Sequence, residues 1–328
     1  MESLLKSIPG TVVFQDDILV TGCNSEEHLH NLEEMLRRLD RLAVDPSPAG
    51  LTSLDLYGCS RIQSAILADL IGCLPRLRKL CLLGTQCNSR VLSAIGGRCG
   101  ELRELDVSQC KEVTPRGLLH LVYDQSRATF TVLQLRRLLT ERVALCPSEV
   151  THQAVTVAFL LLALPRLECV AHTFLAEALT LIHGQHFGSG QQFLQSCGFP
   201  SLAEVVRSGP RSWAGAGVDR STLGLRRLDV ALDHNLALLT STCTQVVEAI
   251  IVRDDGLTDL AHLTSWGKLT HLTLECSGLC GRPLGEVMPV LSRLGPQLRL
   301  LSLQNFRCQP EASLGEFVID SLSANKRF

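Results

Sequence analysis

Aromatic side chains are scarce in this chain of 328 residues, which has 10 phenylalanines, 2 tyrosines and 2 tryptophans. A hydrophobic core must therefore be built from aliphatic side chains, and 62 leucines supply most of them. An excess of one charge is also lacking, because the formal net charge is −2 and the pI is near 6.5. This balance excludes a basic nucleic-acid-binding surface over the whole chain and leaves room only for a local patch.

Secretory and membrane signals are absent as well. The first residues, MESLLKSIPG, have neither the basic start nor the long apolar stretch of a signal peptide. The longest apolar run, Ala158–Leu164, is too short to cross a bilayer. The 14 cysteines form no CxxC pair, and the spacings Cys276–Cys280 and His183–His186 lack a second pair of ligands. We therefore expect a cytoplasmic protein with reduced thiols, no membrane contact, no metal and no other cofactor.

Catalytic motifs are missing too. The sequence contains no GxxxxGK[ST], GxSxG or HExxH, and no GxGxxG after a strand. The acidic pair Asp254-Asp255 falls at a turn, where a capping role is expected. We therefore expect no enzymatic activity.

A repeated leucine pattern is what the sequence does contain. The segments LTSLDLYGC from Leu51, LRKLCLLGT from Leu77 and LRELDVSQC from Leu102 all fit L-x-x-L-x-L-x-x-(C/N/T), the strand signature of a leucine-rich repeat. Further matches begin at Leu164, Leu225, Leu269 and Leu298, weaker ones at Phe130 and Val247, and a degenerate one near Phe199. Such units stabilise one another by stacking, so the pattern predicts an α/β leucine-rich-repeat solenoid of about nine or ten units, with parallel strands on its concave face and helices outside.

Helical patterns lie between these strands. They cover Ser64–Cys73, Ser89–Arg98, Thr114–Tyr123, Val150–Leu164 and Arg282–Leu294. Thr114 is suited to cap its helix, with Pro115 at the first helical position.

The strands that end in cysteine, LDLYGC up to Cys59 and LDVSQC up to Cys110, carry a family resemblance. They resemble the cysteine-containing repeats of F-box/leucine-rich-repeat proteins, the substrate receptors of cullin-RING ubiquitin ligases. The resemblance implies a substrate-recognition adaptor with a cullin–adaptor complex as a partner. The side chain at the position of those cysteines is expected to hydrogen-bond to the backbone where each strand turns away. This position is occupied by Cys59, Thr85, Cys110, Asp233, Asp255 and Ser277.

The segment Ile8–Leu39 does not fit the repeat. It predicts a β-hairpin with Asp16-Asp17 at its turn, followed by a helix with leucines on one side. It resembles a fragment of the reverse-transcriptase palm of Ty3/gypsy-type retroelements, in which an aromatic-x-Asp-Asp hairpin supplies two metal-binding carboxylates. The other parts of such an enzyme are missing, so we expect residues 1–44 to be non-catalytic, either a fused exon or a gene-model artefact, and to cover the edge of the first repeat.

The concave face should carry the binding residues, because variable strand positions line it in a solenoid. The position between the last two core leucines is predicted to be Asp55, Cys81, Asp106, Gln134, Glu168, Asp229, Ile251, Thr273 and Ser302. A neighbouring row holds Lys79, Arg166, Arg227 and His271, interrupted by Glu104. From these rows and their surroundings we select as binding residues Asp55, Tyr57, Lys79, Asp106, Glu168, Arg227, Asp229, His271 and Glu275.

The expected domain organisation has four parts. Residues 1–44 are the retroelement-like fragment, 45–50 a junction, 51–310 the solenoid and 311–328 a C-terminal cap or tail. Irregular loops rich in Gly and Ser are predicted over residues 184–222, with Trp213 as a binding anchor in a loop. A charge-mixed concave face favours a protein partner over nucleic acid, and the alternative function is an inactive remnant of a retroelement RNA-directed DNA polymerase or ribonuclease H.

Overall fold

Two compact units make up the structure, a computed structural model that describes residues 11–14, 17–20, 30–31, 34–35, 51–140, 150–172, 174–210, 223–231, 236–253, 260–276 and 282–307. The first unit consists of Met1–Leu167 and His186–Ala216. The second consists of Glu168–Gln185 and Gly217–Phe328. Each unit has its own parallel strands and its own layer of helices.

The sheet of the first unit follows the order of the sequence. Its strands are β1 (Thr11–Phe14), β2 (Asp17–Val20), β3 (Ser53–Asp55), β4 (Lys79–Cys81), β5 (Glu104–Asp106) and β8 (Arg137–Leu139). All neighbouring pairs are parallel except β1 with β2, which form the antiparallel hairpin predicted near Asp17. Because β2 pairs with β3 in register Asp17 to Ser53, the hairpin extends the sheet beyond the first leucine repeat.

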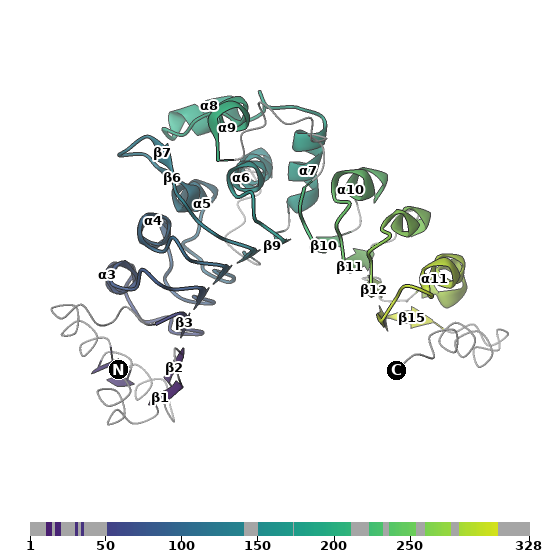
Figure 1. Ribbon diagram of the computed structural model, residues 1–328, viewed down its shortest axis with the longest axis horizontal. Helices are drawn as coiled ribbons and strands as arrows, with labels where there is room; N and C mark the ends of the chain where they lie inside the picture. The colour runs from purple at the N-terminus through teal and green to yellow at the C-terminus, as the bar shows by residue number, and fades with distance from the viewer. Residues whose placement is uncertain are drawn as a thin grey trace. The chain divides into compact units, whose positions relative to one another are not determined.

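One layer of helices covers one face of this sheet (Figure 1). The helices α3 (Ser64–Gly72), α4 (Ser89–Arg98), α5 (Pro115–Val122) and α6 (Val150–Ala163) pack against one another in sequence order. The four helices predicted for this part of the chain are confirmed. The Thr114 hydroxyl accepts a hydrogen bond from the Gly117 N–H at 3.0 Å, and Pro115 begins the helix as expected.

The core lies between the strands and the helices. The central leucines of β3, β4 and β5, namely Leu54, Leu80 and Leu105, are at most 3% exposed. Their neighbours in the sequence alternate outward, so each short strand has one buried and one open side. Burial of each such leucine stabilises the folded state by about 1.5–3 kcal/mol. Leucines can therefore supply the stability of the repeat with few aromatic side chains.

A left-handed residue occurs in each of the turns after β3, β4 and β5. Gly58 and Gly84 have φ of 72°, and Gln109 takes the same place with φ of 58°. The next residue then bonds the backbone: the Thr85 hydroxyl donates to the Leu82 carbonyl at 2.7 Å, and the Cys110 thiol donates to the same oxygen at 3.0 Å. The Cys59 thiol similarly faces the Tyr57 carbonyl at 3.8 Å. The turn role predicted for these three residues is confirmed, while Asp233, Asp255 and Ser277 lie outside the described residues.

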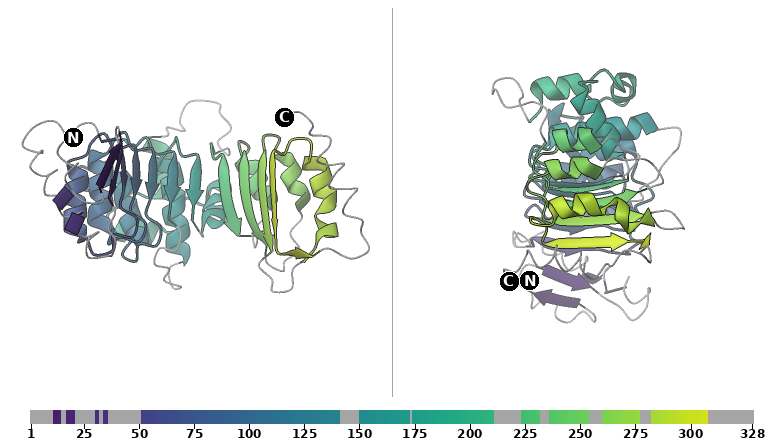
Figure 2. Two further views of the ribbon diagram at one scale, coloured as in Figure 1. Left: turned by 90° about the horizontal axis from the view of Figure 1, so that it is seen from below. Right: turned by 90° about the vertical axis from the view of Figure 1, so that its right-hand side faces the viewer.

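The second unit repeats the same layering (Figure 2). Its parallel strands are β9 (Cys169–Ala171), β10 (Arg227–Ala231), β11 (Glu248–Arg253), β12 (His271–Cys276) and β14 (Leu300–Gln304). Its helices are α7 (Leu175–His183), α10 (Leu236–Thr242), the 3-10 helix η3 (Leu260–Ser265) and α11 (Met288–Leu294). The helix predicted to begin at Arg282 begins only at Met288, because β13 (Arg282–Pro283) pairs with β15 (Phe306–Arg307) and the short 3-10 helix η4 (Leu284–Glu286) follows.

Three predicted repeat starts are wrong in register. In the correctly predicted repeat from Leu102, the Arg103 carbonyl accepts both the Arg136 and the Arg137 N–H, so the next repeat begins at Leu135 and not at Phe130. The same pair of backbone bonds shows that the unit predicted from Leu164 begins at Leu167. It also shows that the unit predicted from Val247 begins at Val246. Position five of these three units is occupied by Leu139, Ala171 and Ile250, of which Ala171 is buried.

An additional layer lies outside α6 in the first unit (Figure 1). It contains α8 (Gln191–Ser196) and α9 (Leu202–Ser208), so the prediction of irregular loops across 184–222 is wrong for these residues. The predicted degenerate repeat near Phe199 is wrong as well, because Ser201 and Glu204 form the capping box that starts α9.

Aromatic rings hold this layer in place. Phe199 packs against Phe159 of α6 at a centroid distance of 6.4 Å and against Tyr123 at 6.0 Å. Tyr123 belongs to a small hairpin of β6 (Tyr123–Asp124) and β7 (Thr129–Phe130), in which it contacts Phe130 at 5.2 Å. Several of the few aromatic residues of the chain are thus concentrated at one insertion.

Cysteines in the described part of the chain are free thiols, most of them buried. Burial raises the pKa of Cys99 and of Cys243 to about 12, so both thiols are protonated and unreactive at neutral pH. Among the described residues, every helix is too short or too polar to cross a lipid bilayer.

Candidate functional site

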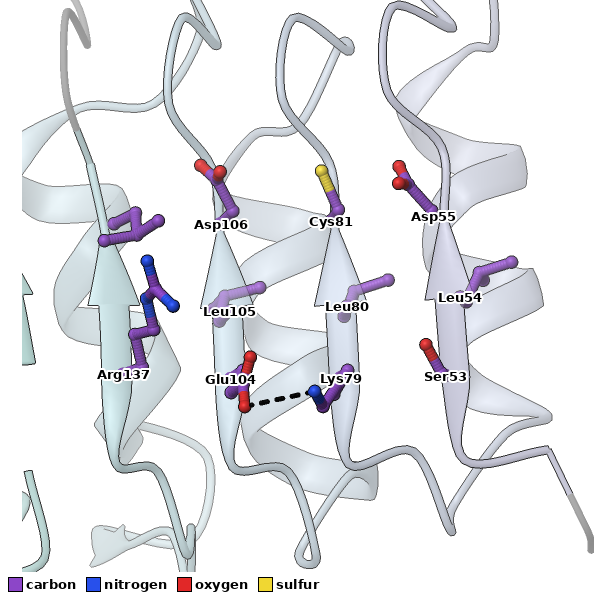
Figure 3. Close-up of a pocket in the computed structure, with 11 residues that line it drawn as sticks. Ser53, Leu54, Asp55, Lys79, Leu80, Cys81, Glu104, Leu105, Asp106 and Arg137 are labelled. Carbon is purple, nitrogen blue, oxygen red and sulfur yellow. Dashed lines mark ion pairs between the residues drawn. The ribbon is translucent and has the colours of Figure 1, made fainter. Parts of the chain in front are cut away.

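A pocket of about 300 Å³ opens on the uncovered face of the first unit, across β3, β4, β5 and β8 (Figure 3). Two rows of side chains line it, because strand positions three and five of each repeat point to this face. The first row contains Ser53, Lys79, Glu104 and Arg137, and the second contains Asp55, Cys81, Asp106 and Leu139.

The second row places two carboxylates on either side of a thiol (Figure 3). One oxygen of Asp55 accepts the Tyr57 N–H and one oxygen of Asp106 accepts the Ser108 N–H, both at 2.9 Å. Burial raises the pKa of the Cys81 thiol to about 12, and the two aspartates strengthen this shift against an opposing hydrogen bond from the Leu83 backbone. Cys81 is therefore a neutral spacer between two anionic groups.

The first row contains two cations and one anion. Lys79 Nζ lies 3.4 Å from Glu104 Oε1, an ion pair between neighbouring strands. Arg137 follows on β8, and its buried Nε has no hydrogen-bond partner. A buried donor without a hydrogen-bond partner costs free energy. A ligand that supplies an acceptor for Arg137 Nε would remove this cost.

The pocket thus offers groups of both charges to a ligand. Among the described residues, neither Asp55 nor Asp106 has an ion-pair partner. A cationic side chain placed over Cys81 would lie between the two carboxylates, about 5 Å from each strand. Tyr57, whose N–H bonds Asp55, is 66% exposed and is not among the residues that line the pocket.

The sequence-predicted binding residues fall into two groups. Asp55, Lys79 and Asp106 line the pocket of the first unit, and Tyr57 lies in the turn after β3, outside the pocket lining. Arg227, Asp229, His271 and Glu275 lie on strands of the second unit. There Arg227 Nη1 pairs with Glu248 Oε1 at 3.2 Å, and the Thr270 hydroxyl lies 2.8 Å from His271 Nδ1.

Three further predicted residues have different outcomes. Glu275 is a half-buried residue of β12 paired with Gln304. Asp229 is a residue of β10 whose side chain is not described, and Trp213 lies outside the described residues. They stay predictions.

Glu168, Gln134 and Ile251 are placed differently from the prediction. Glu168 precedes β9, where its carbonyl accepts the Arg226 and Arg227 N–H, so it does not belong to the acidic row. Gln134 precedes β8, and Ile251 is fully buried in the core of the second unit. Asp106 is therefore the last acidic residue of this row in the first unit, and Leu139 occupies the next place in the row.

Arg137 is the pocket residue that the predicted register missed. The sequence does contain a signal for it, since LRRL from Leu135 repeats the LRRL from Leu225 that was assigned correctly. A second such signal is LPRL, which occurs before Leu77 and before Leu167 and identifies the true start of that unit.

No three His, Cys, Asp or Glu side chains gather closely enough for a metal ion within the part of the chain that the structure describes. Asp16 lies outside the described residues, and only the backbone of Asp17 is described. The retroelement resemblance of this hairpin is therefore still a sequence prediction.

Parallel strands that carry the leucine pattern, each bordered on the same face by helices, define a leucine-rich-repeat fold. No model of a protein family matches the chain. No curated protein matches it either.

Solved structures do show a likeness to this chain. The yeast Rad7 and Elc1 complex has 12% identity and a TM-score of 0.49, covering 87% of this chain and 69% of that chain. The leucine-rich-repeat protein LegL7 from Legionella pneumophila has 15% identity and a TM-score of 0.37, covering 89% and 95%. An internalin from Listeria monocytogenes has 15% identity and a TM-score of 0.35, covering 89% and 85%. At these values the likeness carries no argument about function.

Proposed function

We propose that the chain is a protein-interaction scaffold and that the pocket of the first unit binds a segment of a partner protein. The observation that carries this proposal is the pocket itself, which lies across four adjacent strands and is lined by two carboxylates without an ion-pair partner and by Arg137, whose buried Nε has no hydrogen-bond partner. A shallow surface with charges of both signs favours a polypeptide, whose side chains and backbone supply both donors and acceptors.

The second row defines the chemistry of the partner. Asp55 and Asp106 each keep one oxygen engaged with their own strand turn, which fixes the direction of the carboxylate. A lysine or arginine of the partner can use the remaining oxygens without rearranging the scaffold, so little conformational entropy is lost on binding. The partner segment therefore carries a basic residue.

A narrower role follows from the cysteine-ended strands. Their likeness to the repeats of F-box/leucine-rich-repeat proteins supports a cytoplasmic substrate-recognition adaptor of a cullin-RING ubiquitin ligase, with the free thiols suited to a reducing compartment. In such an adaptor the pocket holds the substrate, and a separate surface holds the cullin–adaptor complex.

Removing the two free charges should release the partner. In the full-length double variant Asp55→Asn and Asp106→Asn, the amide oxygens keep the turn hydrogen bonds while the negative charges are lost. We expect the dissociation constant of the pocket-bound partner to rise about tenfold, because each exposed ion pair contributes up to about 1 kcal/mol. Partners captured on immobilised protein from cytoplasmic extract are compared by quantitative mass spectrometry, and then titrated individually by calorimetry.

Asp69→Asn is the matched control. Asp69 is an exposed carboxylate of α3, on the helix-covered side, where it pairs with Arg90 at 3.1 Å. A partner lost from the double variant and kept by the control supports the pocket, whereas equal capture by all three proteins contradicts it. The adaptor role predicts in addition that cullin and its adaptor protein remain bound when the substrate is lost; their absence from the wild-type capture contradicts that role alone.

A further inference from the structure

Arg137 is a cation of the pocket that has no ion-pair partner among the described residues. It lies on β8 directly opposite Glu104 of β5, where an ion pair between neighbouring strands could form. Glu104 pairs instead with Lys79 on its other side, at 3.4 Å. One carboxylate thus stands between two cations, and the cation at the β8 end of the row is left over.

An arginine at the same repeat position in the second unit shows the alternative. Arg227 of β10 lies opposite Glu248 of β11, and the two side chains pair at 3.2 Å. The repeat can therefore neutralise an arginine at position three within its own sheet. Arg137 occupies the equivalent position without such a partner, so its charge is available to a ligand.

The surroundings of Arg137 make the missing partner costly. The side chain is half-buried, and its Nε is buried without a hydrogen-bond partner. Burial removes part of the hydration of the guanidinium, and no ion pair compensates for this loss. Figure 3 shows the Arg137 side chain extending on the open face toward the carboxyl ends of the strands. A ligand in the pocket can therefore contact it.

The chemistry of a guanidinium favours a carboxylate as its ligand. A carboxylate has two oxygens, which can accept hydrogen bonds from two nitrogens of an arginine at once. Both bonds are charge-assisted, whereas a bond to a neutral backbone carbonyl is assisted by one charge only. The acceptor that best replaces the lost hydration of Arg137 is thus an anionic oxygen pair.

This carboxylate would lie apart from the cation that the aspartates attract. Asp55 and Asp106 lie on the strands on either side of Cys81 of β4, whereas Arg137 belongs to β8, two strands beyond β4. Adjacent strands are about 4.8 Å apart, so the two places are separated by about 9.6 Å across the sheet. Two side chains of one polypeptide segment can span this distance.

We propose that the pocket recognises a segment that carries both a basic and an acidic residue. The basic residue lies over Cys81 between the two aspartates, and the acidic residue binds Arg137. This inference rests on the proposed function, which supplies the basic residue, and it adds a second group of opposite charge. It also gives the direction of the segment across the sheet, from β4 toward β8. A segment with basic residues alone is disfavoured, because its second cation would meet Arg137.

The test is a titration of the full chain with labelled glycine–serine peptides whose ends are blocked. Each peptide carries one lysine and one glutamate, two to eight residues apart and in both orders, and each has a partner peptide with glutamine in place of glutamate. At the best spacing the glutamate peptide should bind about fivefold more tightly, and salt should reduce this preference. Fluorescence anisotropy measures the dissociation constants.

Variants of Arg137 assign this preference to its guanidinium. In Arg137→Gln the glutamate and glutamine peptides should bind equally, and Arg137→Lys should keep part of the preference because it keeps the charge without the two-nitrogen contact. Arg90→Gln is the control, since Arg90 is an exposed arginine of α4 that pairs with Asp69. It should keep the full preference. Equal preference in Arg90→Gln, Arg137→Gln and Arg137→Lys would overturn the proposal.

A further arm identifies the source of the carboxylate. The lysine–glutamine peptide is also made with a free carboxyl terminus, at the same spacings from the lysine. Binding that is tightened by this terminus and not by glutamate would overturn the acidic residue in favour of a chain end. Tightening by glutamate that Arg137→Gln abolishes supports the proposal.

Failure of this inference can be told apart from failure of the proposed function. Asp55→Asn with Asp106→Asn should weaken binding of both the glutamate and the glutamine peptide while their ratio stays about fivefold. If wild-type protein binds both peptides equally and the aspartate variant weakens both, the acidic residue is wrong and the basic one stands. If replacing the lysine by glutamine changes no affinity, the proposed function fails and this inference fails with it.

Discussion

Gly96→Ala is expected to destabilise the protein by about 2 kcal/mol. A Cβ added to Gly96 in α4 would lie 2.3 Å from the Leu121 carbonyl oxygen and 2.9 Å from its carbonyl carbon. Both are backbone atoms of α5, so α4 and α5 would have to move apart along their contact. Overpacking of this kind costs about 1–3 kcal/mol or more, while the better helix propensity of alanine returns up to about 1 kcal/mol. Urea unfolding followed by circular dichroism measures the change.

Gly97 provides the matched control in the same helix. No atom lies within 4 Å of a Cβ added there. Gly97→Ala should therefore stabilise the protein by up to about 1 kcal/mol through helix propensity alone. If the two variants change the free energy of unfolding in the same direction, the close approach of α4 and α5 does not determine the effect.

Acidification to pH 4 is expected to remove about 3 kcal/mol of stability through His172. His172 follows β9 and is only 5% exposed. Its Nδ1 accepts the Phe174 N–H at 3.1 Å, while its buried Nε2 has no hydrogen-bond partner. Burial lowers the pKa of His172 from 6.5 to about 4, because a charged imidazole would lose its hydration in the core.

The sign follows from the two protonation states. Above pH 6.5 the imidazole is neutral in both the folded and the unfolded chain, so its pKa does not affect the free energy of unfolding. Between pH 6.5 and about 4 the unfolded chain binds a proton that the folded chain does not, and stability falls as the pH falls. Each unit of pKa difference corresponds to about 1.4 kcal/mol.

Denaturant unfolding at a series of pH values tests this dependence. His172→Gln should flatten the curve between pH 6.5 and 4, whereas the same substitution at the exposed His186 should leave its shape unchanged. A wild-type curve without this decline, or one that His172→Gln does not alter, would show that His172 is not buried as a neutral ring.

Leucine periodicity predicted the fold and most of the strands. Starts at Leu51, Leu77 and Leu102 were assigned correctly because each segment permits only one frame with buried apolar residues at positions one, four and six. The same rule failed where a repeat has a polar residue at position six. The true frames from Leu135 and Leu167 place the buried Thr140 and His172 there, so the apolar rule chose earlier frames. Backbone hydrogen bonds between repeats set the true frames, and periodicity does not contain them.

Candidate site residues were predictable only where the frame was right. Asp55, Lys79 and Asp106 were found in this way and do line one pocket, but Arg137 was missed through the error at Leu135. The α8–α9 layer was missed for a different reason. Its sequence is rich in Gly and Ser, which indicates loops, and its stability comes from contacts of Phe199 with the distant Phe159 and Tyr123.

The small β6–β7 hairpin has a consequence for how such a chain can change over evolutionary time. It lengthens the distance from Leu102 to Leu135 to 33 residues, against 25 from Leu77 to Leu102. The pairing of β5 with β8 nevertheless keeps Asp106 opposite Leu139. Insertions behind the sheet therefore leave the spacing of the ligand-facing rows untouched. Selection can add or delete material on the helical side without changing the recognition face, and can alter that face one rung at a time.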